Sequence, residues 1–333
     1  MNSSPETWDS CVEAGRQAYE KGCYAEADQI LARTMERFSS NAYQRDMVFV
    51  DLLMVYARVK RERNEFADAL SLYYRALSIL QMKAKRERVM IARILQEIAV
   101  CHCLSGRFFH AREKEKRALR ILDEIYGVES QTVDDCIIRL ACLSWVLEDM
   151  DSASVYLEKH LRHAVKQRNL EGQAMVAPTS MLAQVHYRIG NYLESEQLFE
   201  QAREFFQEKK KLAKEFSIIG NQLGMSICAQ GRCEEARRLC RESAEIRSEC
   251  YDRGEKLDKS EVINDIADFY CMMGDFKSAQ KLCESAESLR WDAPEGSMAD
   301  KLLLYSRLLT RLGHSEEIER LSRRVRELKQ IAS

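Results

Sequence analysis

One pattern of small and large residues recurs along the whole sequence at a spacing of about 42 residues. The pattern is clearest over residues 182–202, where apolar residues recur at helical spacing on both sides of Gly190. Ala183 and Ser195 are small, and two helices approach closely only where neither of them carries a bulky side chain. The stretch therefore predicts a helical hairpin, in which two helices are joined by a tight turn at Gly190.

Three positions of this hairpin can be followed through eight copies. The contact position of the first helix holds Gly15, Ala57, Ala99, Ala141, Ala183, Gly224, Ala267 and Ser306. The contact position of the second helix holds Ala27, Ala69, Ala111, Ala153, Ser195, Ala236, Ala279 and Ile318. The turn position holds Gly22, Asn64, Gly106, Glu148, Gly190, Gly231, Gly274 and Gly313. Because a helix that ends in a left-handed residue favours Gly first and Asn second, only Glu148 departs from the pattern.

The order of small and large residues around a central glycine resembles the tetratricopeptide repeat (TPR) family. The period of about 42 residues is similar to the kinesin light chain type of TPR, as are segments 117–127 and 242–252 and the placement of Asn221 and Asn264. The resemblance implies an all-α fold, a right-handed α-solenoid of eight TPR helical hairpins that forms a single domain over residues 1–333. The expected hairpins are approximately 6–38, 42–83, 85–126, 128–167, 170–214, 215–252, 255–291 and 295–331.

Charge and composition exclude several classes of partner. A formal net charge of −2 gives no basic surface for a nucleic acid, and no run of about 18 apolar residues is present to span a membrane. The polar start of the sequence lacks the features of a signal peptide, so we expect a cytoplasmic protein, with a monomer favoured. In that reducing compartment the twelve cysteines stay thiols, and many occupy packing positions of the repeat.

Catalytic and metal-binding motifs are missing from the sequence. We find no nucleophile elbow, HExxH, Walker loop or dinucleotide turn, and Gly220 and Gly224 lie inside a predicted helix. Residues 101–103 (Cys-His-Cys) and the pair His160 and His163 lack further ligands at metal-binding spacing, and adjacent ligands on a helix diverge. We therefore expect no enzyme, no metal and no cofactor.

The TPR resemblance also implies a binding surface, because the first helices of TPR hairpins line a concave groove. The residues expected to line it here are Arg16, Tyr19, Arg58, Arg61, Ile138, Cys142, Trp145, Gln184, Tyr187, Asn221 and Asn264. The set begins with basic residues, becomes apolar around Trp145 and ends in amides, which offer a donor and an acceptor to a peptide backbone. Two interpretations of Trp145 stay open, a binding anchor or a core residue, and the matching Arg61 favours a position that is at least partly exposed.

The arginines at positions 16, 58 and 61 are either solvated or paired with acidic residues on their own helices, such as Glu20 and Glu62. The leading functional hypothesis is a protein–protein interaction adaptor or scaffold that binds a peptide or helix of a partner protein in the groove. The alternatives are a regulatory peptide-sensing receptor and a structural, self-associating solenoid.

Overall fold

The computed structural model describes residues 8–39, 47–82, 87–166, 173–204, 213–252, 302, 305 and 318–332. Thirteen helices and no strand are found in this part of the chain, which confirms the predicted all-α fold class. The helices are α1 (Trp8–Glu20), α2 (Tyr24–Ser39), α3 (Met47–Glu62), α4 (Phe66–Met82), α5 (Arg88–Leu104), α6 (Phe108–Tyr126), α7 (Gln131–Val146), α8 (Met150–Lys166), α9 (Gln173–Arg188), α10 (Tyr192–Glu204), α11 (Ala213–Ala229), α12 (Cys233–Asp252) and α16 (Ile318–Ala332).

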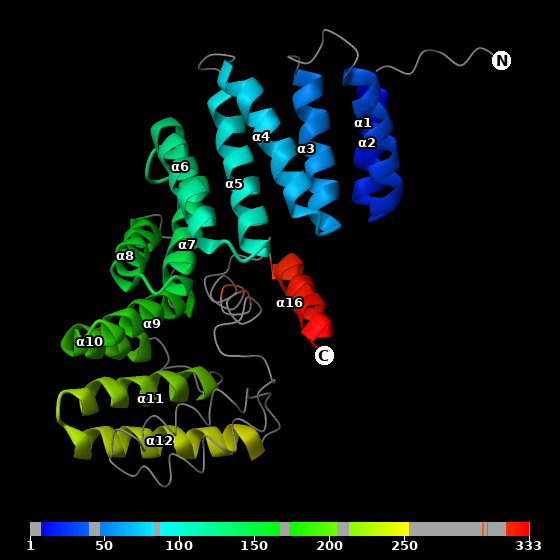
Figure 1. Cartoon of the computed structure of the whole chain (residues 1–333). Coiled ribbons are helices and arrows are strands. Elements are labelled where there is room, and N and C mark those ends of the chain that lie inside the picture. Colours follow the sequence, from blue (N-terminus) through cyan, green and yellow to red (C-terminus); the bar gives the residue numbers. More distant parts are fainter. Residues whose placement is uncertain are drawn as a thin grey trace. The chain divides into compact units, whose positions relative to one another are not determined.

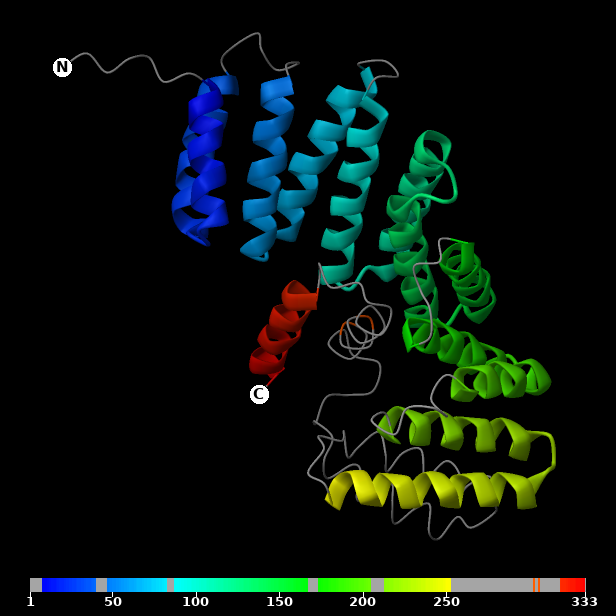
Figure 2. The same ribbon diagram turned by 180° about the vertical axis from the view of Figure 1, so that it is seen from behind.

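The chain divides into two compact units, residues 1–136 and 137–333. In the first unit α1–α2, α3–α4 and α5–α6 form hairpins, and α2 and α4 pack on the hairpins that follow them. Figures 1 and 2 show α3, α4 and α5 side by side in this unit. In the second unit α9–α10 and α11–α12 form hairpins, and α8 and α10 provide the contacts between consecutive hairpins. Within each unit, the stacking of one hairpin on the next is the packing of a solenoid.

The turns of the described hairpins share one backbone geometry. The turn residues adopt left-handed φ angles of 60° to 86° and are Gly22, Asn64, Gly106, Glu148, Gly190 and Gly231. At each of them the N–H of the left-handed residue donates to the carbonyl three residues earlier, and the next N–H donates to the carbonyl five residues earlier. This is the Schellman pattern, which satisfies the last carbonyls of a helix. The repeat of about 42 residues is therefore confirmed in three dimensions, and Glu148 adopts the shared geometry despite its side chain.

Small residues hold the two helices of a hairpin together, as the sequence predicts. A Cβ atom at Gly15 would lie 2.4 Å from the side chain of Leu31, and one at Gly224 would lie 2.5 Å from Cys240 Sγ and 3.3 Å from the carbonyl oxygen of Ala236. The matching first-helix alanines of α3, α5, α7 and α9 are also buried. The contact residues of the second helices are also fully buried. They are Ala27, Ala69, Ala111, Ala153, Ser195 and Ala236.

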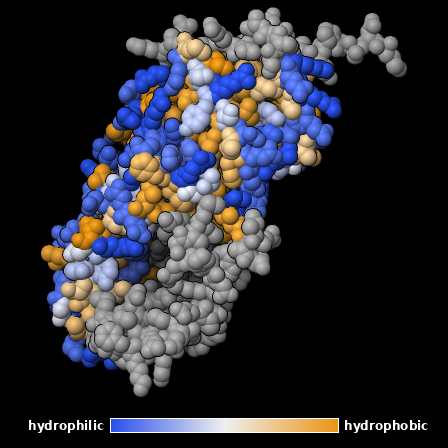
Figure 3. Space-filling model, in the orientation of Figure 1, coloured by the Kyte–Doolittle hydropathy of each residue, from blue (hydrophilic) through white to orange (hydrophobic). Residues whose placement is uncertain are grey.

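The face shown in Figure 3 is mostly polar, and the exposed residues of α16 are charged. On the face shown in Figure 3, polar and charged side chains are interspersed with smaller apolar patches. In α16, Leu321 and Val325 are buried while the charged residues between them are more exposed. None of the described helices is long and apolar enough to cross a bilayer. The predicted hairpin at 255–291 lies outside the described residues, and the single-domain organisation stays a prediction.

Candidate interaction surface

The residues predicted to line the groove differ strongly in exposure. Five keep part of their side-chain surface open: Arg16, Tyr19, Arg58, Gln184 and Tyr187. Five others are buried: Arg61, Ile138, Cys142, Trp145 and Asn221. Asn264 lies outside the described residues. A ligand can contact only the first group without rearrangement of the packed helices.

Arg61 corrects the expectation that its register is partly exposed. Its side chain is 1% exposed, and its guanidinium pairs with Glu97 of α5 and, at 3.3 Å, with Glu62. Arg58 binds the other oxygen of Glu97, with its Nη2 2.9 Å away, and the Tyr73 hydroxyl donates to Glu97 at 3.4 Å. Burial alone lowers the pKa of Arg61, but Tyr73 and Glu97 raise it overall well above its usual value. The network makes this arginine a core residue.

Trp145 is buried as well, so its alignment with Arg61 no longer favours an exposed position. Its side chain is 7% exposed, and the neighbouring first-helix residues Ile138 and Cys142 are 4% and 0% exposed. Asn221 is 1% exposed, so its amide is also enclosed. In the conformation described here, these residues have the exposure of a core and leave little surface for a ligand.

The half-exposed tyrosines are held in pairs. Tyr187 of α9 packs on Tyr192 at the start of α10, with ring centroids 5.6 Å apart and an interplanar angle of 58°. Tyr19 and Tyr24 form the equivalent pair in the first hairpin, at 5.7 Å and 51°. Both pairs connect the last turn of a first helix to the start of the second helix, across a turn of fixed geometry. The rings are therefore positioned before any ligand arrives.

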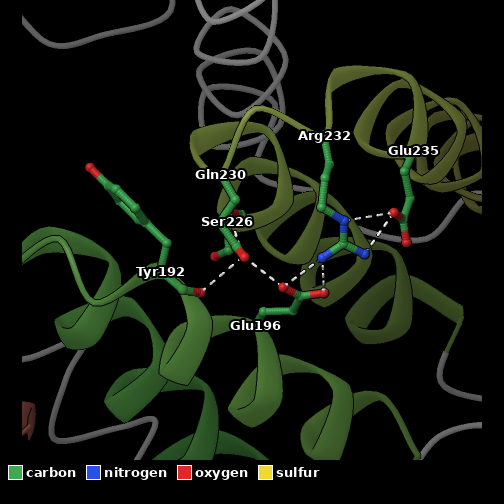
Figure 4. Close-up of polar contacts among 6 residues, drawn as sticks. All are labelled: Tyr192, Glu196, Ser226, Gln230, Arg232 and Glu235. Atoms are coloured by element: carbon green, nitrogen blue, oxygen red, sulfur yellow. Dashed lines mark hydrogen bonds and ion pairs between the residues drawn. The ribbon is translucent and has the colours of Figure 1, made fainter.

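A polar cluster fixes the backbone of Tyr192 from the next hairpin (Figure 4). The side chain of Gln230 donates to the Tyr192 carbonyl at 3.4 Å and to a carboxylate oxygen of Glu196 at 2.6 Å. Glu196, 8% exposed in its side chain, also accepts two hydrogen bonds from Arg232, at 2.7 and 2.9 Å. Arg232 is further bound to Glu235 at 2.6 Å, and hydrogen bonds with Glu196 and Glu235 raise its pKa. The cluster joins α10 to the α11–α12 hairpin.

Figure 4 also shows that the Tyr192 ring points away from this ion pair. The carboxylate of Glu196 is satisfied by Arg232 and Gln230, so the cluster has the character of a support. The hydroxyls of Ser195 and Ser226 are 2.8 Å apart in the interface between α10 and α11. We conclude that the polar cluster positions the tyrosine pair, and that the rings of Tyr187 and Tyr192 are the part of this surface that a ligand can reach.

Sequence reasoning missed the partners that come from neighbouring hairpins. Glu97 was not among the candidate residues, and neither were Glu196, Gln230 and Arg232. A signal was present, since a carboxylate and an arginine stand about one repeat apart at positions 196 and 232. Pairs at that spacing lie on adjacent hairpins, whereas the ion pairs expected from the sequence lie within single helices.

The histidines and cysteines considered as metal ligands can be located in the described part of the chain. There, no group of three or more His, Cys, Asp or Glu residues is arranged to hold a metal ion. His102 is buried and packs on His110, with ring centroids 5.4 Å apart. Nine cysteines have side chains that the structure describes, and their thiols are not joined in disulfides.

Comparisons with known proteins identify the repeat. The model of a family described as tetratricopeptide repeat matches residues 216–290, whereas no curated protein matches the chain. The C-terminal part of a TPR repeat-containing protein from Cytophaga hutchinsonii is 16% identical, covering 87% of this chain and 99% of that one with a TM-score of 0.52. A tetratricopeptide repeat protein from Parabacteroides merdae is 16% identical, covering 90% and 98% with a TM-score of 0.51.

The nearly identical TPR-like repeats of a kinesin light chain candidate from Podospora anserina are 18% identical to this sequence. They cover 59% of this chain and 94% of their own, with a TM-score of 0.48. At these identities the first two structures establish a shared fold, and the family model adds the repeat in the sequence itself. The family match over residues 216–290 and the shared fold show that this chain contains tetratricopeptide repeats, and the equivalent hairpin turns extend the same geometry along the described residues.

Proposed function

We propose that this protein is a non-enzymatic scaffold that binds a peptide segment of a partner protein. Contact would be made on the first-helix face of the α9–α10 hairpin, with Tyr187 and Gln184 at its centre. The observation that carries the proposal is the half-exposed Tyr187 ring, held against Tyr192 at 5.6 Å. Tyrosine is enriched among the residues that dominate binding energy at protein interfaces.

Preorganisation supports this choice of residues. A ring that is already packed loses little conformational entropy when a ligand binds, so more of the contact energy appears as affinity. Gln184 stands one helical turn before the tyrosine and is also half-exposed, and its amide can pair with both the N–H and the C=O of an extended peptide. The two residues would supply an apolar anchor and a backbone contact.

The first unit would offer a second contact of similar kind. Tyr19 is packed on Tyr24, and Arg16 precedes it by about one turn on the same helix with a side chain that is 39% exposed. Arg16 and Arg58 are bound to Glu13 and Glu97, so we assign them a role in steering an acidic segment more than in holding it. The buried candidates, from Arg61 to Asn221, are assigned to the core.

The proposed location is the cytoplasm, and the proposed state without ligand is a monomer. Cysteines that occupy buried packing positions of the repeat, such as Cys103 and Cys240, suit a reducing compartment. No nucleic acid or membrane partner is proposed for a chain with a net charge of −2. The partner class is therefore a protein with an exposed peptide segment.

Affinity capture with matched variants tests the proposal. The tagged full chain, Tyr187→Ala and Tyr126→Ala would be used to capture partners from a lysate, with each captured protein quantified by mass spectrometry. Tyr126 is the control, because it is a 50% exposed tyrosine on α6, outside the first-helix faces. We expect Tyr187→Ala to lose a partner by a factor of about 10 to 30, as for an aromatic hot spot worth about 2 kcal/mol.

Thermal melting of both variants would be measured in parallel, and it should stay close to that of the unmodified chain. Equal capture by all three proteins would contradict the proposal, as would a loss that is shared by Tyr126→Ala. Capture of nothing but further copies of this chain would favour the self-associating solenoid instead.

A further inference from the structure

The turn between α11 and α12 brings two thiols into contact. The Sγ of Cys228 lies 3.7 Å from the Sγ of Cys233 and donates a weak hydrogen bond to it. Cys228 is 6% exposed near the end of α11, and Cys233 is half-buried as the first residue of α12.

The repeat geometry accounts for this contact. Cys228 and Cys233 occupy the two positions that hold Tyr187 and Tyr192 one repeat earlier, where the rings touch at 5.6 Å. The backbone is fixed here by the same turn, with Gly231 N donating to Cys228 O at 2.9 Å and Arg232 N to Ile227 O at 3.2 Å. The turn geometry therefore brings these two positions into contact, and in this hairpin both residues are cysteines.

We propose that Cys228 and Cys233 form a redox-sensitive site that hydrogen peroxide or an organic hydroperoxide converts into a reversible intramolecular disulfide. A disulfide needs an S–S distance of about 2.05 Å, so the sulfur atoms must approach each other by about 1.7 Å. The proposal requires rotation of the two side chains to supply this movement. The inference does not depend on the proposed peptide-binding face, because neither cysteine belongs to it.

The two thiols are suited to different steps. Cys233 is the first residue of α12 and the more accessible of the two thiols, so a hydroperoxide reaches it first. Burial, followed by the hydrogen bond with Cys233, raises the pKa of Cys228 to about 11, so Cys228 remains a protonated thiol at neutral pH.

The chemistry balances with a hydroperoxide as the oxidant. In the first step the Cys233 thiolate attacks one peroxide oxygen, an S–O bond forms and the O–O bond breaks. Cys233 becomes a sulfenic acid while the peroxide is reduced to water or an alcohol. In the second step the Cys228 sulfur attacks the Cys233 sulfur, the S–S bond forms, and the hydroxyl group leaves as water with the Cys228 proton. Two thiols lose two electrons, which the peroxide accepts.

Peptide mapping tests this site directly. Trypsin cuts after Lys214, Arg232 and Arg237, so Cys228 and Cys233 lie on separate fragments, 215–232 and 233–237, that only a disulfide can join. The folded full chain would be treated with equimolar hydrogen peroxide, blocked with N-ethylmaleimide, digested without reductant and analysed by mass spectrometry. We expect the joined fragment, a loss of two of the twelve thiols in titration, and full recovery with dithiothreitol.

Two variants keep the result specific. Cys233→Ser should abolish the joined fragment and leave Cys228 alkylated, whereas Cys23→Ser, which removes an exposed cysteine, should behave like the unmodified chain. The proposal is overturned if the joined fragment is absent from the folded protein. It is equally overturned if Cys233 proceeds to sulfinic acid with Cys228 still reduced, or if the disulfides that form join different molecules.

Discussion

Arg61 illustrates how a residue with a charge can belong to the core of this repeat. Its side chain is 1% exposed and depends on Glu97, which lies on α5 in the next hairpin. Removing one partner of a buried ion pair costs about 3 to 5 kcal/mol, because the other charge is left without compensation. Glu97→Ala should therefore lower the free energy of unfolding by about 3 kcal/mol, measured by urea denaturation.

The control for this prediction is Glu124→Ala, which removes the partner of Arg88 in a pair whose side chains are 62% and 38% exposed. An exposed pair contributes about 0 to 1 kcal/mol, so this variant should be nearly as stable as the unmodified chain. If the two variants lose the same stability, Glu97 does not neutralise a buried charge.

His102 gives the fold a dependence on pH. Burial, followed by the charges of Arg107, His110 and Lys114, lowers its pKa from 6.5 to about 4, and neither ring nitrogen has a hydrogen-bond partner within the described residues. Between these pKa values the unfolded chain binds a proton that the folded chain does not, so stability is complete above pH 6.5 and falls as the pH approaches 4.

From pH 7 to pH 5 we expect this one residue to account for a loss of about 2 kcal/mol. The difference in unfolding free energy between the two pH values should shrink by that amount in His102→Phe, and much less in His110→Gln, which alters an exposed histidine. An unchanged pH dependence in His102→Phe would show that His102 binds the same number of protons in the folded and in the unfolded chain.

The hairpin turn is the element for which sequence reasoning was strongest. Left-handed backbone was expected at Gly and Asn positions and is found there, and the same geometry is imposed on Glu148 at φ 60°. An L-residue other than glycine pays about 1 kcal/mol in this conformation. Glu148 is exposed, so Glu148→Gly should raise the free energy of unfolding by about 1 kcal/mol, measured by thermal and urea melting.

Asn64→Gly is the matched comparison, and it should gain less because asparagine tolerates the left-handed region better than glutamate does. Gly190→Ala should move the other way and lose about 1 kcal/mol. A stability loss in Glu148→Gly would mean that the glutamate side chain contributes more than its backbone strain costs.

At the level of helices, periodicity and small residues were enough to place both helices of each described hairpin. They could not place the contacts between hairpins, because those depend on how far each helix is rotated when it packs on the next. For that reason Glu97 was missed as the partner of Arg58 and Arg61, and the Glu196–Arg232 pair was missed altogether. It is also why a shared register was wrongly expected to imply shared exposure for Arg61.

In the described part of the chain, hairpins follow one another with the same local packing while their surface chemistry varies. Six described turns keep one geometry, yet the pairs of residues that flank them differ, and they include two tyrosine pairs, an arginine with a phenylalanine, and a pair of cysteines. A scaffold of this kind lets individual hairpins acquire separate roles without disturbing their neighbours. We place the proposed peptide contact on the α9–α10 hairpin and the proposed redox site on the α11–α12 hairpin.

Site-specific photo-crosslinking tests the proposed binding face most directly. A benzophenone amino acid would replace Tyr187 in one version of the full chain and Tyr126, exposed on α6, in another. After illumination in a lysate, we expect a discrete crosslinked partner at position 187 and none of it at position 126. A partner that is trapped at position 126 and not at 187, or equally at both, would contradict the assignment of the first-helix face as the interaction surface.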